Sequence, residues 1–202
     1  PTRRSSDLQD TLTRVEPDAA QSVLLAILEA RSPDTHDHSQ RVSRMAVTLG
    51  RTMGLPVEQI RNLERAALLH DIGKIAMPPR LLGDSSLLAD ADMTLLRQHV
   101  TIGAEILRAI PVLAYAAPIV EATHERMDGR GYPASLTADS IPLEARVISV
   151  ADVYDALTGV CPYREPMSRD QANAELVKAS GNQLDPAIVR AWLGMAEGVR
   201  CS

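Results

Sequence analysis

The sequence of 202 residues predicts an all-α protein, a single helical domain with a helical lead-in at its N-terminus. Apolar residues recur three and four positions apart along nearly the whole chain, and this is the period of an amphipathic helix. Glycine and proline fall between these periodic segments, where helices begin and end. Because neither an internal repeat nor a low-complexity linker divides the sequence, one domain accounts for the pattern.

The first half of the chain is predicted to hold three helices before a loop. Residues 9–30 carry the apolar spacing of the helical lead-in, and residues 42–53 form the periodic part of a helix that a glycine and a proline end. The next helix covers residues 57–73, whose apolar positions continue up to a glycine. Two prolines and a Gly-Asp-Ser-Ser cluster then predict a loop at residues 78–88.

The second half shows the same helical period. Its helices are expected at residues 90–107, 113–127, 143–157, 168–179 and 185–197. Pro111 separates the first two, and the glycines and proline of "DGRGYP" at 128–133 predict a loop. The run "RVISV" at 146–150 would also suit a strand, but it lies inside a longer helical pattern.

Composition narrows the class of protein. A net charge of -5 argues against a general nucleic-acid surface, so we expect no DNA partner. Cys161 and Cys201 have no metal-binding or disulfide spacing, as is usual for free thiols in a reducing cytoplasm. No apolar run approaches the ~20 residues of a membrane helix, and no signal-peptide core is present, which predicts a cytoplasmic chain. Residues 1–8 resemble adaptor-derived sequence and are expected to be non-native or disordered.

Four histidines and three aspartates are expected to face the interior from separate helices. In chain order they are Asp34, His38, His70, Asp71, His99, His124 and Asp152. A single such histidine is usually a core residue with one hydrogen bond, and a lone buried aspartate is usually a cap or half of an ion pair. Together they would need many complementary cations, which the apolar faces lack. One metal cluster satisfies all of them at once, so the sequence predicts a metal centre.

The types of ligand narrow the metal and the chemistry. Imidazole and carboxylate without thiolate suit Fe, Mn, Ni, Co or Zn. His70 and Asp71 project in different directions from a helix end, so Asp71 could bridge two ions while His70 holds one. Ions about 3.5–4 Å apart can activate a shared hydroxide and hold a phosphoryl group in line. Lys74, one turn past His70, would contact the phosphate; the alternative is an exposed lysine at a helix C-terminus.

These residues lie in motifs that resemble the HD-GYP family, the cyclic-di-GMP phosphodiesterase branch of the HD superfamily. The two naming motifs match "HDIGKI" at 70–75 and "HERMDGRGYP" at 124–133. Three further matches, "HSQRV", "QHVTIGAEIL" and "IPLEARVISVADVYDAL", lie at residues 38–42, 98–107 and 141–157. The resemblance covers roughly residues 20–195, and five motifs in the family's order make it specific.

The resemblance implies an all-helical HD-GYP domain at residues 31–197 that binds two or three divalent metal ions, often iron or manganese. By position, the ligands of one ion would be His38, His70, Asp71 and Asp152. Asp71 would also bridge to a second ion that His99 holds in part, with His124 as a further ligand. Asp34 matches an acidic position associated with a third ion.

The resemblance also implies an activity and partners. Family members hydrolyse cyclic-di-GMP to the linear dinucleotide, and some continue to GMP. Asp71 and Lys74 would be catalytic, and Lys74 and Arg164 would contact phosphates. Tyr132 is the expected exposed contact of the "DGRGYP" loop, which the family links to diguanylate cyclase (GGDEF) domains. An N-terminal sensor or receiver module is expected to precede the chain.

Two departures from the family pattern leave other functions open. Thr123 stands where the family has the first of two adjacent histidines, and this leaves one metal site a ligand short or filled by water. Cys161 replaces an arginine, removing a phosphate contact of roughly 1.5–3 kcal/mol. Reduced activity is therefore expected. The alternatives are a degenerate domain that binds ligand or a cyclase without turnover, and a phosphohydrolase for another nucleotide, such as a hybrid cyclic dinucleotide.

Overall fold

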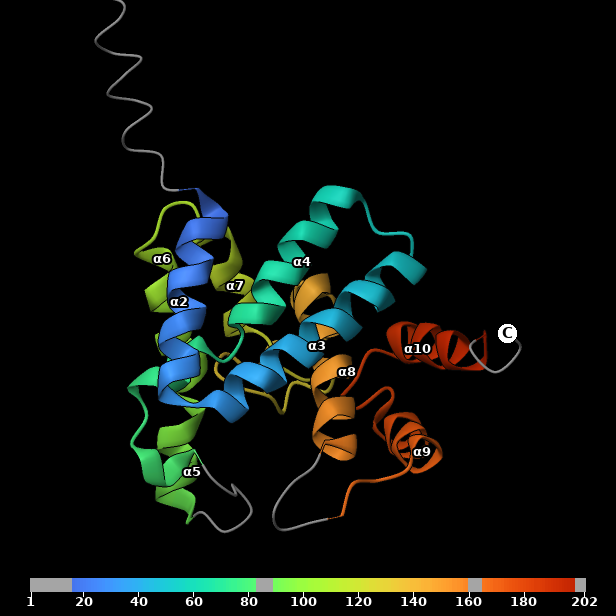
Figure 1. Ribbon diagram of the computed structural model, residues 1–202. Helices are drawn as coiled ribbons and strands as arrows, with labels where there is room; N and C mark the ends of the chain where they lie inside the picture. The colour runs from blue at the N-terminus through green and yellow to red at the C-terminus, as the bar shows by residue number, and fades with distance from the viewer. Residues whose placement is uncertain (1–15, 83–88, 160–164, 199–202) are drawn as a thin grey trace, which may run out of the picture.

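The computed structural model describes residues 16–82, 89–159 and 165–198, and over these ranges the predicted all-α fold is confirmed (Figure 1). The α-helices are α2 (Pro17–Arg31), α3 (Pro33–Thr52), α4 (Val57–Leu69), α5 (Asp90–Arg97), α6 (His99–Arg108), α7 (Ala117–Glu121), α8 (Leu143–Thr158), α9 (Arg169–Ala179) and α10 (Pro186–Gly198). Short 3-10 helices are η1 (Ile72–Ala76), η2 (Pro79–Leu81), η4 (Ala114–Ala116) and η5 (Ala138–Ser140). Within the described ranges, β-pairing is limited to two isolated bridges.

The core forms around α3, which packs against α4 and α8 and also contacts α2 and α10. Figure 1 shows α2, α5 and α6 on one side of this centre and α9 and α10 on the other. Leu28, Leu49, Leu63 and Ile148 are fully buried and come from four different helices. Burying such side chains contributes roughly 1.5–3 kcal/mol each, so the apolar stripes of the sequence hold the helices together.

Local signals set several helix ends. Prolines occupy the first turns of α2 and α3, where a missing N–H is tolerated. Gly54, just after α3, adopts a left-handed conformation with φ +75°, which terminates the helix as the sequence predicts. Ser168 and Gln171 form a capping box at the start of α9.

Two predicted helices differ in length from the structure. The helix expected at 57–73 ends at Leu69, and the chain then turns at His70 and Asp71 into η1. The helix expected at 90–107 divides into α5 and α6, because the N–H of Gln98 bonds back to the carbonyl of Leu95 in a tighter turn.

The prediction of a helix at 113–127 is wrong for its second half, after Glu121. Only η4 and α7 are helical, and the chain leaves the helix after Glu121. The N–H groups of Met127 and Asp128 bond instead to the carbonyls of Gln183 and Asn182. A tertiary contact with the segment between α9 and α10 therefore replaces the helix that the local pattern favours. "RVISV" is helical, inside α8.

The helical lead-in packs on the rest of the protein. Ala20, Leu24 and Leu28 of α2 are buried and belong to the main hydrophobic core. The expectation for residues 1–8, and the start of the lead-in before α2, lie outside the described residues. Within the described part of the chain, the helices are too short or too polar to cross a membrane.

Candidate metal centre

Six of the seven predicted metal ligands meet at one place in the fold. They are His38 of α3, His70 at the end of α4, Asp71 in the following turn, His99 at the start of α6, His124 after α7 and Asp152 of α8. Asp34 lies one turn before His38 on α3, is exposed, and lines the same cavity. Segments far apart in the sequence therefore contribute to a single cluster.

A close backbone contact brings α6 to the turn after α4. Gly73 of η1 faces Gly103 and the carbonyl of His99, and a Cβ on Gly73 would lie 1.9 Å from that oxygen. Only glycine fits this approach. The contact places His99 beside Asp71, so the glycine of the "HDIGK" motif helps to build the cluster.

Asp71 stands between two groups of nitrogen atoms. Its Oδ2 lies 3.5 Å from Nε2 of His70 and 3.9 Å from Nε2 of His38, and its Oδ1 lies 3.3 Å from Nε2 of His99. His38, His70 and Asp71 form one group that could hold an ion, and Asp71, His99 and His124 form a second, each with its ligand atoms within 4.8 Å of one another. A carboxylate shared in this way could bridge two cations.

Asp152 completes the first group from the side of α8. Its Oδ1 lies 3.1 Å from Nε2 of His38. Burial raises the pKa of Asp152, but the hydrogen bond to His38 and the charge of that ring together outweigh burial and hold the pKa below its usual range. The side chain is therefore an anionic ligand candidate at neutral pH.

Unpartnered atoms in the second group fit a metal ion. Oδ1 of Asp71, Nε2 of His99 and Nε2 of His124 are buried and form no hydrogen bond. Buried polar atoms without a partner are costly and rare in proteins. All three belong to the second group, and a divalent cation would satisfy them together. The residues present therefore fit a metal centre.

Hydrogen bonds on the far sides of the rings orient the ligands. Nδ1 of His70 donates to the carbonyl of Ala67 at 2.8 Å, and Nδ1 of His99 donates to that of Leu96 at 2.7 Å. A carbonyl can only accept, so each Nδ1 carries the proton. Each Nε2 then keeps its lone pair and faces the cluster, which is the usual arrangement of metal-ligating histidines.

Asp155 orients the third ring. Its Oδ2 lies 2.7 Å from Nδ1 of His38, and Arg41 donates to both carboxylate oxygens at 2.8 and 2.9 Å. Asp155 follows Asp152 by three residues on α8, so the spacing places it on a similar face, although Asp155 is not among the ligands predicted from the sequence. Asp155 is thus a buried carboxylate that binds the side of the His38 ring facing away from the cluster.

Burial and neighbouring charges set the protonation of the cluster. Burial lowers the pKa of His70, and lowers that of His124 to about 4, so both rings are neutral at pH 7. Burial also opposes ionisation of Asp71, but the positive charge of Lys74 holds its pKa well below the usual range. The neutral rings of His70 and His124 beside the ionised carboxylate of Asp71 are in the state that a cation needs.

Lys74 is close to the cluster rather than at a free helix end. Its Nζ donates to Oδ2 of Asp71 at 2.7 Å, and it lines the cavity above the ligands. The ion pair balances the buried carboxylate. Arg164, which is predicted to contact a phosphate, and Cys161, which stands in place of a family arginine, lie outside the described residues.

The "DGRGYP" loop is tied to the cluster through Glu125. This buried carboxylate accepts hydrogen bonds from the N–H groups of Ala134 and Leu136 at 2.7 and 3.0 Å. A Cβ on Gly131 would lie 2.5 Å from Cα of Glu125, so the two backbones touch only because residue 131 is glycine. Glu125 was not selected from the sequence, although it stands next to His124.

Tyr132 is the residue of the loop that reaches the cluster. Its ring stacks on that of His124, with centroids 5.1 Å apart and an angle of 11° between the rings. The side chain is partly buried, not fully exposed as the sequence analysis expected, because the loop folds back over His124. Burial raises the pKa of the phenol, so Tyr132 is a neutral hydrogen-bonding group at the cavity wall.

The hydroxyl of Thr123 bonds to the backbone and not to the metal-ligand cluster. The buried side chain donates to the carbonyl of Val120 at 2.9 Å, in the turn that follows α7. Ser149 of α8 donates to the carbonyl of Thr123. The residue that replaces a family histidine is thus part of the local backbone hydrogen bonding.

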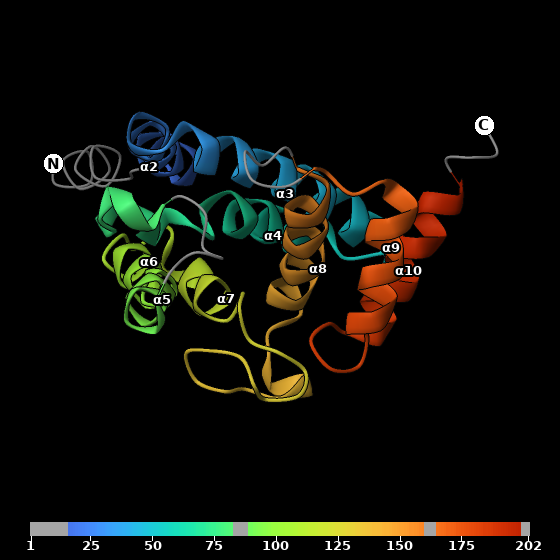
Figure 2. The same ribbon diagram turned by 90° about the horizontal axis from the view of Figure 1, so that it is seen from below.

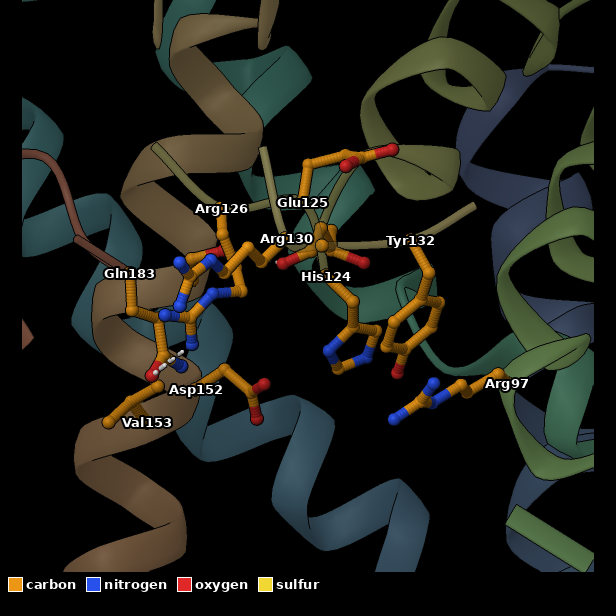
Figure 3. A pocket seen from close by; sticks show the side chains of 12 residues that line it. Arg97, His124, Glu125, Arg126, Arg130, Tyr132, Asp152, Val153 and Gln183 are labelled. Atoms are coloured by element: carbon orange, nitrogen blue, oxygen red, sulfur yellow. Dashed lines mark hydrogen bonds between the residues drawn. The ribbon is translucent and has the colours of Figure 1, made fainter. Parts of the chain in front are cut away.

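Two cavities open onto the cluster. One of about 330 Å³ lies between α8 and the "DGRGYP" loop (Figure 3), and the other, of about 490 Å³, lies above His38, Asp71 and His99. Figure 2 shows the loop beneath α7 and α8 on this side of the molecule. Each cavity is large enough to admit part of a nucleotide-sized ligand.

Comparison with known proteins shows the family of the chain. The family model for the HD domain matches residues 22–188, a span that includes every candidate ligand. The chain belongs to the HD-domain family. The predicted resemblance, and with it the superfamily to which the two naming motifs point, is thereby confirmed.

Two curated relatives are at least 34% identical to this HD domain over the aligned residues. It is 39% identical over 174 residues to the cyclic di-GMP phosphodiesterase response regulator RpfG of Xanthomonas campestris pv. campestris, covering 85% of this chain and 46% of that protein. It is 34% identical over 189 residues to the 3'3'-cGAMP-specific phosphodiesterase 2 of Vibrio cholerae, covering 93% of this chain and 35% of that protein. The chain thus spans less than half the length of either relative.

Solved structures support the fold. The HDG"Y"P protein Bd1817 from Bdellovibrio bacteriovorus superposes with a TM-score of 0.69 at 20% sequence identity, and the match covers 90% of this chain and 62% of that one. At this identity the likeness concerns the fold alone.

Proposed function

We propose that this HD domain is a metal-dependent phosphodiesterase, a hydrolase that cleaves a cyclic dinucleotide in bacterial second-messenger signalling. The proposed reaction converts cyclic-di-GMP to linear pGpG, with GMP as a further product. The observation that carries the proposal is the carboxylate of Asp71, which lies between two groups of imidazole nitrogens. The curated relatives, which are named phosphodiesterases, support it.

We propose two divalent metal ions, iron or manganese, with a third near Asp34. The two ligand groups that share Asp71 support two ions, and the absence of thiolate from both groups suits iron or manganese. Asp34 lines the same cavity as His38, which supports an acidic ligand at its edge. When bound, paired ions supply an activated water and stabilise charge on the phosphoryl oxygens.

The side chains of this chain would position the substrate and balance charge. Asp71 holds the two ligand groups together, and Lys74 neutralises part of its charge while facing the cavity. In the proposed complex, Lys74 and Arg164 contact phosphates, and Tyr132 forms the wall beside His124. The carboxylate of Glu125 keeps that wall in place.

Two partners remain proposals from the sequence. A diguanylate cyclase (GGDEF) domain would contact the "DGRGYP" loop, whose residues Arg130 and Pro133 are exposed. An N-terminal sensor or receiver module would regulate the HD domain. The relative named a response regulator supports this second proposal.

The direct test is hydrolysis by metal-loaded protein. Protein purified without oxygen and loaded with Fe²⁺ or Mn²⁺ is incubated with cyclic-di-GMP and with 3'3'-cGAMP, and products are separated by chromatography. We expect linear dinucleotide, with the preferred substrate giving the base specificity. Asp71→Asn and chelator-treated wild type serve as controls and should be inactive. Absence of product at high enzyme concentration would reject the proposed activity.

The binding-only alternative is not favoured, because both curated relatives are named phosphodiesterases. The double substitution Thr123→His and Cys161→Arg separates the two functions. Thr123 borders the cavity of about 330 Å³, which offers room for an imidazole. An active parent whose rate rises with the substitutions supports the enzyme. A parent that only binds, and hydrolyses once both residues are replaced, supports the binding module.

A further inference from the structure

The two cavities beside the cluster share one wall. Four residues line both of them: Arg97, His124, Tyr132 and Asp152. His124 and Asp152 belong to the candidate metal centre, and Tyr132 stacks on His124. Arg97 is the one cation in this shared set, and it is the last residue of α5.

Most cations around the cavities already have a carboxylate partner. Arg41 binds Asp155, and Lys74 binds Asp71. Arg126 donates to both oxygens of Asp128 at 3.0 and 2.7 Å. These side chains balance charges of the protein itself, so a ligand would have to compete for them.

Arg97 differs from these cations. Its side chain is exposed, and in the described part of the chain it pairs with no carboxylate. Its guanidinium carbon lies 5.2 Å from the centre of the Tyr132 ring, a cation–π contact that holds the group at the cavity without using its N–H donors. The five N–H donors of its planar guanidinium therefore remain available to bind an anion.

Arg130 is the competing candidate, since it also lines a cavity and has no carboxylate partner among the described side chains. It stands on the loop and borders only the smaller cavity. Figure 3 shows Arg97 approaching from one side and Arg126 and Arg130 from the other, with His124 and Asp152 between them. Arg97 is carried by a helix, touches both cavities and is held by an aromatic ring, which favours it as a preorganised site.

We propose that Arg97 binds the phosphodiester group of the cyclic dinucleotide that is not being hydrolysed. The proposal rests on the proposed function and adds a positioning residue to it. A cyclic dinucleotide carries two phosphodiesters, and while one occupies the metal centre the other needs a cation outside it. The Tyr132 ring contacts both His124 and Arg97, so it separates the guanidinium from the metal-ligand cluster. The planar guanidinium of Arg97 suits a phosphate.

Binding to Mn²⁺-loaded protein tests the proposal without turnover. The probe is a phosphorothioate analogue of cyclic-di-GMP that resists hydrolysis, measured by calorimetry with Arg97→Ala, Arg97→Lys, Arg130→Ala and Arg51→Ala. Arg51 is an exposed arginine in the last turn of α3 and serves as the matched control. We expect Arg97→Ala to raise Kd about tenfold, Arg97→Lys to raise it less, and Arg51→Ala to leave it unchanged.

A second substrate separates phosphate binding from a structural effect. Bis(p-nitrophenyl) phosphate has one phosphodiester and no second phosphate. Arg97→Ala should raise KM for cyclic-di-GMP with little change in kcat, and should leave hydrolysis of bis(p-nitrophenyl) phosphate as in the wild type. Equal losses on both substrates would indicate a structural role and overturn the proposal.

The binding and kinetic results keep the two proposals apart. Wild type that binds the analogue more tightly than Arg97→Ala but hydrolyses nothing supports the subsite and rejects the phosphodiesterase. Active wild type whose affinity is unchanged by Arg97→Ala, or is weakened more by Arg130→Ala, rejects the subsite and keeps the phosphodiesterase. Wild type that does not bind the analogue rejects the subsite as well.

Discussion

At the scale of single residues, two carboxylates contact the two nitrogens of the His38 ring and fix its orientation. Asp155 accepts at Nδ1 at 2.7 Å, and Asp152 lies 3.1 Å from Nε2. Asp155 cannot leave this position easily, because Arg41 holds both of its oxygens. The orientation of a candidate ligand thus depends on a residue that belongs to neither ligand group.

We expect Asp155→Asn to lower metal affinity about 10–100-fold, because the amide removes the charge that orients and strengthens the His38 imidazole. Metal content after competition with a chelator measures the effect. Asp18→Asn is the control, since Asp18 is a mostly exposed aspartate that also pairs with an arginine, Arg65. Equal metal content in Asp155→Asn and wild type would contradict the role given to Asp155.

His38 also makes the metal-free protein sensitive to alkaline pH. Burial lowers its pKa, but the hydrogen bonds to Asp152 and Asp155, together with the negative charges of Asp152 and Asp71, outweigh burial and raise the pKa to about 10. A pKa raised on folding stabilises the protein fully below pH 6.5 and less as pH rises toward 10. In chelator-treated protein, we expect the unfolding free energy to fall over this interval by an amount of order a few kcal/mol.

The measurement is urea unfolding at several pH values between 6.5 and 10. His38→Gln should lose most of this pH dependence, whereas His36→Gln should retain it, because His36 lies outside the cluster and pairs only locally. If the two variants gave identical pH profiles, another group would have to be responsible.

At the scale of structural elements, the contact between η1 and α6 decides whether the two ligand groups share Asp71. Gly73 and Gly103 lie at this contact, and a Cβ on Gly73 would overlap the carbonyl of His99. A backbone obstacle cannot be relieved by rotating a side chain. The whole helix α6 would have to move, and His99 with it.

Gly73→Ala should therefore destabilise the protein by about 2–3 kcal/mol and remove metal from the second group. Denaturant unfolding and metal content per chain measure the two effects. Gly103→Ala should be milder, because its Cβ would lie 3.2 Å from the nearest backbone atom, the N of Gly73. Gly194→Ala in α10 is the control, since a Cβ there meets nothing within 4 Å. Full metal content in Gly73→Ala would contradict this account.

At the scale of the whole molecule, the metal centre joins segments that lie far apart in the sequence and pack around one hydrophobic core. Its ligands come from α3, the turn after α4, α6, the segment after α7, and α8. The cluster exists only in the folded chain, so an ion that binds there stabilises the folded state. The HD domain should accordingly be more stable with metal than without.

We expect chelation to lower the melting temperature by about 5–10 °C. This is the shift expected for a domain of this size when the free metal concentration is roughly 100 times the Kd. Differential scanning calorimetry before and after chelator treatment measures it. Asp71→Ala lacks the shared carboxylate, so its melting temperature should not respond to the chelator. An equal response in Asp71→Ala would place the stabilising ion elsewhere.

The sequence by itself determined the helical class, most helix positions and the candidate ligands. Helices follow from local hydrogen bonding and a local apolar period, and the motif residues identify themselves by type and spacing. The same local reasoning placed a helix at 113–127, where the bonds of Met127 and Asp128 to Gln183 and Asn182 overrule it. It also passed over Glu125, whose role depends on a loop that folds back onto it.

Only the tertiary structure decided which of these residues meet. His38 and Asp155 are 117 positions apart, and their contact depends on how α3 and α8 pack rather than on any local pattern. The same packing placed Arg97 between two cavities and turned the hydroxyl of Thr123 to the carbonyl of Val120. Sequence spacing sets the face of a helix on which a side chain lies, whereas distances across the fold follow from the close packing of separate helices.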